Sequence, residues 1–126
     1  MSKKVIATPN APAAVGPYSQ GWIAGDFVYT AGQGGLDPAS GCLVSDTVEG
    51  QAEQACKNVG AILEEAGASF ADVVKTTVFL AHITDFAAFN AVYARYFTEK
   101  PARTCVAARD LPLGMLCEIE AVAYIG

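Results

Sequence analysis

The chain has 126 residues, of which 52% are hydrophobic and 17% are charged, and its formal net charge is −5. This size and composition predict one globular domain over residues 1–126 that builds a sizeable core and leaves no room for a separate cofactor domain. The acidic balance, with no basic run longer than Lys3-Lys4, argues against a nucleic-acid-binding protein, because such proteins gather Lys and Arg against phosphates.

The N-terminal third of the chain predicts strands joined by turns. Residues 28–31, Val-Tyr-Thr-Ala, are rich in residue types that favour strands, and Gly32 ends the run. Gly, Pro and Asp then cluster over residues 34–41, which predicts a turn-rich connection.

A helix is predicted after this connection. Asp46 is placed to cap it, with Glu49 at the third helical position in the manner of a capping box. Gly67 is placed to end the helix in a left-handed conformation. One buried face is indicated by apolar residues at the spacing of a helical stripe: Ala52, Ala55, Cys56, Val59, Ile62, Leu63 and Ala66.

A strand and a second helix are predicted next. Residues 73–80, Val-Val-Lys-Thr-Thr-Val-Phe-Leu, are rich in β-branched types and predict the strand. The helix is predicted to begin at Thr84 or Asp85, and Pro101 lies beyond its end. Its expected apolar stripe consists of Phe86, Phe89, Tyr93, Tyr96 and Phe97.

Two further strands are predicted near residues 103–108 and 116–125, the second with clear alternation of residue types. The order of strands, helix, strand, helix and strands predicts an α+β fold, in which two helices pack on one face of a single mixed sheet. The other face, which carries aromatic and aliphatic residues, then also needs cover. We therefore expect other copies of the chain to cover it in a closed homo-oligomer.

The four cysteines stand at spacings that match no zinc site and no CxxC motif: Cys42, Cys56, Cys105 and Cys117. We expect no secretory signal before them, because Met-Ser-Lys-Lys leads directly into sequence typical of a fold. No apolar run approaches the length of a membrane span. We expect a cytoplasmic protein with reduced thiols, no metal and no membrane association.

Arg103 and Glu118 are the main candidates for chemistry. Arg103 opens a predicted strand, and alternation places it on the same face as Cys105. A guanidinium pairs with both oxygens of a carboxylate, so Arg103 is a candidate carboxylate clamp, and an ion pair with a structural glutamate is the alternative. Glu118 and Glu120 share a face of the last strand. One could orient a water or take its proton while the other pairs with Lys75 or Arg103, or both could be solvated.

Two glycine-containing segments are further candidates. Residues 16–21, Gly-Pro-Tyr-Ser-Gln-Gly, predict a turn in which the phenol of Tyr18 could line a pocket as a donor, although tyrosines in turns more often pack. Residues 32–35, Gly-Gln-Gly-Gly, match no GxGxxG or P-loop pattern and do not support nucleotide binding. His82 is the only histidine, which leaves no histidine pair for acid–base catalysis.

These segments together resemble the RidA/YjgF family of reactive-intermediate deaminases. The most specific parts of the resemblance are Pro-Ala-Arg-Thr at residues 101–104 and Glu-Ile-Glu-Ala at residues 118–121. It extends through nearly the whole chain, over residues 10–20, 30–33, 74–79, 85–90, 101–106, 111–112 and 118–121.

The resemblance implies a chorismate-mutase-like fold and a homotrimer with active clefts between neighbouring subunits. It also implies hydrolysis of 2-iminobutanoate and 2-iminopropanoate to 2-oxo acids and ammonia, with no metal or organic cofactor. Arg103 matches the arginine that pairs with the substrate carboxylate, and Glu118 matches the glutamate that holds the attacking water. Other substrate-binding positions are matched by Tyr18, Gly32, Asn90 and Cys105.

Two other functions compete with imine hydrolysis. Some relatives cleave RNA or inhibit translation, but the acidic composition argues against that activity here. A non-catalytic module that binds small carboxylates could keep both Arg103 and Glu118. The chain also departs from the family near the expected cleft, with a short loop at residues 98–100 and with Gly34-Gly35 in place of bulkier apolar residues, and both departures bear on substrate preference.

Overall fold

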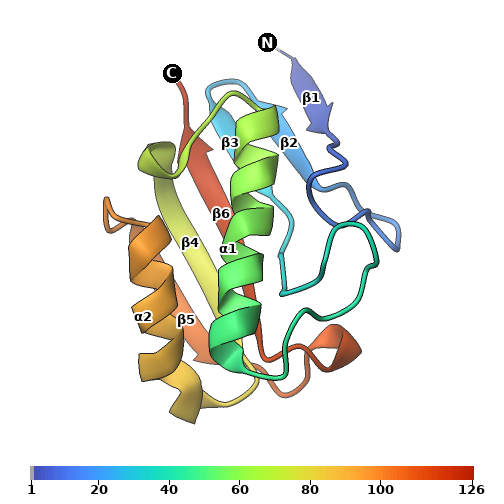
Figure 1. Ribbon diagram of the computed structural model, residues 1–126. Coiled ribbons are helices and arrows are strands. Elements are labelled where there is room, and N and C mark those ends of the chain that lie inside the picture. Colours follow the sequence, from blue (N-terminus) through green and yellow to red (C-terminus); the bar gives the residue numbers. More distant parts are fainter. Residues whose placement is uncertain (1) are drawn as a thin grey trace.

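Six strands form one mixed sheet in the computed structural model, which describes residues 2–126 (Figure 1). Their order across the sheet is β1-β2-β3-β6-β4-β5. Neighbouring strands are antiparallel except β4 and β5, which are parallel and are connected through a helix, as a parallel pair requires. In chain order the strands are β1 (Lys3–Ile6), β2 (Gly21–Ala24), β3 (Phe27–Thr30), β4 (Val73–Leu80), β5 (Ala102–Ala107) and β6 (Cys117–Tyr124).

Two helices, α1 (Val48–Glu65) and α2 (Phe86–Tyr96), lie side by side over one face of this sheet (Figure 1). The core lies between them and the sheet, and its strand side chains come mainly from β4 and β6 at the centre. The expected α+β class, with a single mixed sheet and two helices on one face, is confirmed. Within residues 2–126, no helix combines the length and apolar character needed to cross a membrane.

The N-cap of α1 differs from the prediction, whereas the residue that ends the helix agrees with it. Thr47 is the N-cap, since its hydroxyl accepts a hydrogen bond from the Gly50 backbone N–H at 3.1 Å, so the predicted cap at Asp46 is wrong. Threonine and aspartate both offer the side-chain oxygen that a cap needs, which is why composition alone did not separate them. Glu49 lies in the first turn but not at the third position. Gly67 has a φ of +79°, which confirms the predicted left-handed residue after the helix.

The start of α2 also shifts by one or two residues. A short 3₁₀ helix (Ile83–Asp85) precedes it, so the regular helix begins at Phe86 rather than at Thr84 or Asp85. Phe86 is 42% exposed because it lies in the first turn, at the edge of the sheet. The rest of the predicted stripe is buried or half-buried: Phe89, Tyr93, Tyr96 and Phe97.

No helix among residues 2–126 covers the sheet face opposite α1 and α2. Residues that stand directly opposite one another across five strands form a row on this face: Val5, Trp22, Tyr29, Val122 and Lys75. Trp22 is 38% exposed and Tyr29 46%. An apolar surface of this kind favours association, so coverage by other copies of the chain stays a prediction with a physical basis.

Candidate active site

Arg103 lies on the edge strand β5 and is held against α2. It stands directly opposite Thr76 of β4, so it projects from the helix-covered face of the sheet. Its Nη1 donates a hydrogen bond of 2.7 Å to Oδ1 of Asn90. The centre of the guanidinium lies 4.8 Å from the ring of Tyr93 and 5.4 Å from the ring of Phe86. These contacts leave the side chain half-buried, with other N–H groups free to bind a ligand.

The charge of Arg103 has no carboxylate partner in the described part of the chain. The two ion pairs found in residues 2–126 join Arg95 to Glu53 and Arg109 to Asp110. The alternative interpretation, an ion pair between Arg103 and a structural glutamate, is therefore wrong within one chain. Because Asn90 is neutral, the guanidinium keeps a full positive charge for an anionic ligand.

Cys105 lies two residues beyond Arg103 on the same side of β5, as alternation predicted. Burial raises the pKa of its thiol, and the positive charge of Arg103 opposes this by a smaller amount. The thiol is therefore protonated at neutral pH and is a poor nucleophile. All four cysteines are unpaired, and among residues 2–126 no three His, Cys, Asp or Glu side chains gather closely enough to hold a metal ion.

Glu118 lies in β6 and projects from the opposite, uncovered face. It stands directly opposite Phe79 of β4, and it is half-buried while Glu120 is exposed. Burial, and after it the negative charge of Glu120, raises the pKa of the Glu118 carboxyl. A half-buried carboxylate with a raised pKa is suited to taking a proton from water.

Gly32 provides the space that the Glu118 carboxylate occupies. The chain beyond β3 pairs with β6 through two hydrogen bonds between Gln33 and Ile119, of 2.8 and 2.9 Å, which sets Gly32 beside Glu118. A Cβ atom built on Gly32 would lie 2.5 Å from Oε2 of Glu118. Only glycine therefore leaves the carboxylate where it stands.

A cavity of about 100 Å³ opens beside Glu118. Tyr18 and Gly32 line it together with Glu118, and its other walls are largely apolar, with Leu36, Leu113 and Met115 among them. This composition suits a small ligand that has an apolar side chain and one reacting polar centre. The structure thus brings together three of the predicted site residues, Tyr18, Gly32 and Glu118.

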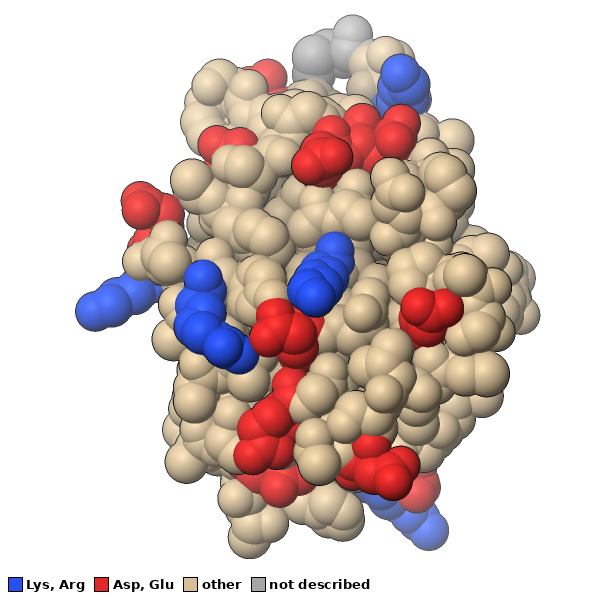
Figure 2. Space-filling model, viewed as in Figure 1, with Lys and Arg blue, Asp and Glu red and all other residues tan. Residues whose placement is uncertain are grey.

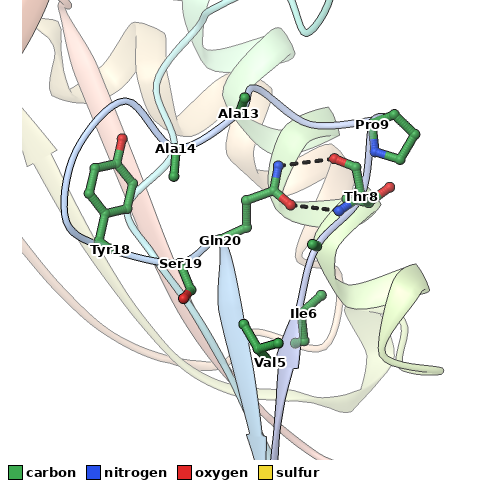
Figure 3. A pocket seen from close by; sticks show the side chains of 10 residues that line it. Val5, Ile6, Thr8, Pro9, Ala13, Ala14, Tyr18, Ser19 and Gln20 are labelled. Carbon is green, nitrogen blue, oxygen red and sulfur yellow. Dashed lines mark hydrogen bonds between the residues drawn. The ribbon is translucent and has the colours of Figure 1, made fainter.

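Tyr18 is positioned by a loop that Gln20 fastens. The backbone N–H of Thr8 donates to Oε1 of Gln20 at 2.6 Å, and Nε2 of Gln20 donates to the Thr8 carbonyl at 3.0 Å (Figure 3). The same Nε2 also reaches the carbonyls of Ala11 and Pro12. A second, larger hollow of about 430 Å³ lies against this loop (Figure 3). The sequence analysis assigned no role to Gln20. The one signal for such a role was the place of this polar residue in the predicted turn of residues 16–21.

The two groups of site residues do not meet within one chain. Asn90, Arg103 and Cys105 lie on the helix-covered side, whereas Glu118 lies on the uncovered side. Glu118 is two strands away from β5 and level with Val106, which places it roughly 10 Å across and roughly 10 Å along the sheet from Arg103. One chain supplies a cationic half-site and a carboxylate half-site that face in opposite directions.

Comparison with known proteins gives consistent matches over the full length. The family model described as Endoribonuclease L-PSP matches residues 8–125. The 2-iminobutanoate/2-iminopropanoate deaminase of Homo sapiens is 50% identical over 125 residues, which are 98% of this chain and 91% of that protein. The protein of the same name from Salmonella typhimurium is 50% identical over 124 residues, covering 95% and 96% of the two chains. The crystal structure of E. coli TdcF with bound serine matches with a TM-score of 0.93 at 42% identity, covering 98% and 99%.

Proposed function

The chain belongs to the RidA/YjgF family, whose model is described as Endoribonuclease L-PSP, and from this membership we propose that it hydrolyses 2-imino acids to 2-oxo acids and ammonia. The observation that carries the proposal is the guanidinium of Arg103, whose one side-chain hydrogen bond to residues 2–126 goes to the neutral Asn90, so that it is free to bind a carboxylate. Two relatives named 2-iminobutanoate/2-iminopropanoate deaminase support this class of substrate. The serine bound to TdcF, itself a small amino acid with a carboxylate, supports a site of this size.

The proposed reaction uses both half-sites together. Arg103 binds the substrate carboxylate and fixes the imine carbon. Glu118 takes a proton from water while the water oxygen forms a bond to that carbon, and the proton passes to the nitrogen. In the resulting adduct, which carries –OH and –NH2 on one carbon, the hydroxyl proton is transferred to the nitrogen as the C–N bond breaks, so that ammonia leaves and the C=O bond of the 2-oxo acid forms. The raised pKa of Glu118 keeps its basicity above that of an ordinary glutamate.

A complete site of this kind combines two copies of the chain, because the half-sites face in opposite directions. We infer a homotrimer in which Arg103 and Asn90 of one subunit face Glu118 and Tyr18 of the next. The uncovered aromatic row through Trp22 and Tyr29 supports burial of that sheet face between subunits. Light scattering should give the mass of a trimer at micromolar concentration, and a monomer mass would contradict the shared site.

A mixed-subunit experiment tests the shared site directly. Arg103→Ala and Glu118→Gln each remove one half-site, and each homotrimer should be nearly inactive. When the two variants are unfolded together in equal amounts and refolded, about one quarter of the interfaces should combine an intact Arg103 with an intact Glu118. Ammonia release from enzymatically generated 2-iminobutanoate should recover to about one quarter of the wild-type rate per site.

The control is the same treatment of each variant alone, which should restore nothing. If both residues served one site within one chain, every site in the mixture would still carry a defect and activity would stay absent. Recovery therefore distinguishes a site between chains from a site within one chain, independently of the exact substrate.

Gly32→Ala should displace the Glu118 carboxylate, because the added Cβ would occupy its place. We expect kcat to fall by up to about 100-fold, since a displacement of ~1 Å in a reacting group has effects of that order. KM should change little because Arg103 is untouched. Steady-state ammonia release and a thermal melt check this, and a folded variant with normal kcat would show that Glu118 does not need its observed position.

RNA cleavage is not favoured as the activity. On the helix-covered face in Figure 2, acidic side chains are spread in several groups and basic side chains lie among them instead of forming one patch. The net charge of −5 acts in the same direction. The ammonia assay run beside an RNA-cleavage assay at equal protein concentration separates the two activities.

A further inference from the structure

Tyr93 lies directly under the Arg103 guanidinium and is itself rigidly held. The centre of the guanidinium is 4.8 Å from the centre of the Tyr93 ring, within the range of a cation–π interaction. The ring is 8% exposed and stacks on Phe97 with centroids 4.4 Å apart and planes 21° apart. Its hydroxyl shares a buried hydrogen bond of 2.6 Å with the hydroxyl of Thr76.

These contacts connect α2 with β4 and β5, and the pairing of β4 with β5 connects the two strands to each other. Thr76 is the residue directly opposite Arg103 in the pairing of β4 with β5. The strand pair that carries Arg103 therefore also fixes the ring on which Arg103 rests. Asn90 lies three residues before Tyr93 on α2, so the Asn90 amide and the Tyr93 ring lie on the same side of the helix.

We propose that Tyr93, held by Thr76, is a positioning residue that orients the Arg103 guanidinium for binding a carboxylate. The inference rests on the proposed carboxylate clamp and goes beyond it by assigning a role to a buried aromatic that otherwise belongs to the core. An arginine side chain has many rotamers, and two contacts select one of them here. Nη1 of Arg103 donates to the amide oxygen of Asn90, and the Tyr93 ring lies against the face of the guanidinium. Burial raises the pKa of Tyr93, so the ring stays neutral beneath the cation.

The decisive measurement is binding of 2-oxobutanoate, the carboxylate product, by calorimetry to the assembled protein. Tyr93→Leu removes the ring and should weaken binding by about tenfold. In an Arg103→Ala background the same change should have no further effect, because the guanidinium that the ring orients is gone. Tyr96→Leu is the matched control. Tyr96 is on the same helix but packs on Phe70 at 5.6 Å, so its loss should leave the dissociation constant unchanged.

The outcomes separate this inference from the proposed function. If Arg103→Ala leaves 2-oxobutanoate binding unchanged, the carboxylate clamp itself is wrong. If Arg103→Ala weakens binding while Tyr93→Leu does not, or if Tyr93→Leu has an equal effect in both backgrounds, the clamp stands and the positioning role is overturned.

A second variant carries the test if Tyr93→Leu does not fold. Thr76→Val is nearly isosteric at a position that is 1% exposed, and it frees the phenol while keeping the ring. We expect it to weaken 2-oxobutanoate binding by about threefold through the loosened ring. An unchanged dissociation constant in folded Thr76→Val would overturn the inference, because a structural hydrogen bond alone would lower only the melting temperature.

Discussion

Arg103→Ala should lower kcat/KM for 2-iminobutanoate hydrolysis by about 100-fold or more while the chain stays folded. A hydrogen bond to a charged group contributes roughly 1.5–3 kcal/mol. Losing two such bonds to one carboxylate therefore costs roughly 3–6 kcal/mol, which exceeds the roughly 2.7 kcal/mol that corresponds to a 100-fold change in rate. Arg103 makes no ion pair in the described chain and is half-buried at a sheet edge. Its removal therefore leaves no unpaired buried carboxylate behind.

Arg103→Lys is the informative partner of this variant. Lysine keeps the positive charge but has a single ammonium group, which cannot pair with both carboxylate oxygens while also donating to Asn90 in the observed geometry. We expect activity between that of the wild type and that of Arg103→Ala, nearer the latter. Ammonia release and thermal melts measured together check both variants, and a folded Arg103→Ala protein within a few-fold of wild-type kcat/KM would refute the clamp.

The sequence predicted the central elements of the fold better than its N-terminal edge. The stripe from Ala52 to Leu63 repeats at helical spacing, and residues 73–80 are β-branched, so α1 and β4 follow from local pattern. The three short strands before residue 31 have no comparable period. Their pairing depends on long-range contacts, such as Tyr29 with Val122, that no local window contains.

The sequence names the candidate site residues, which stay predictions, but it does not give their arrangement. Alternation along β5 correctly placed Arg103 and Cys105 on one face. The same rule could not separate Glu118 from Glu120, because both share a face. In the structure Glu118 lies against Gly32 and lines the cavity, whereas Glu120 is exposed. Residue spacing along each strand also could not show that Arg103 and Glu118 face opposite sides of the sheet.

The contacts around Arg103 were hidden for a related reason. Asn90 and Tyr93 are on a helix 13 and 10 positions before Arg103, and their contact depends on how α2 packs over the edge of the sheet. An aromatic at helical spacing is first interpreted as core. Tyr93 is core by burial, yet one side of its ring contacts the guanidinium, and only the packed structure distinguishes those two surfaces.

Glu118→Gln should lower kcat by about 100-fold or more with little change in KM. Glutamine keeps the shape of the side chain and its fit beside Gly32, but it cannot take a proton from water, and general-base catalysis contributes roughly 100- to 10,000-fold. KM should change little because the proposed mechanism assigns carboxylate binding to Arg103. Steady-state kinetics with ammonia detection give kcat and KM separately. Full turnover by the Glu118→Gln variant would show that another group is the base.

The raised pKa of Glu118 adds a pH signature to this prediction. The base must be ionised, so kcat should fall as the pH drops through a pKa that lies above the ordinary value of 4.5. Glu120→Gln is the matched variant, because the Glu120 charge is the second cause of the raised pKa after burial. It should keep turnover at neutral pH and move the acid limb to lower pH. An acid limb that stays in place would show that Glu118 is not the group whose ionisation limits the rate.

The same shift fixes the sign of the stability effect. The pKa of the Glu118 carboxyl is higher in the folded chain than in the unfolded chain. As the pH rises from the unfolded pKa through the folded pKa, the free energy of unfolding therefore decreases, because the folded state holds the proton more tightly and loses it at a greater cost. Neutral glutamine at position 118 avoids this cost. The Glu118→Gln protein should therefore melt at or above the wild-type temperature at pH 7 while nearly inactive, and a lower melting temperature would mean that the carboxylate also holds the structure together.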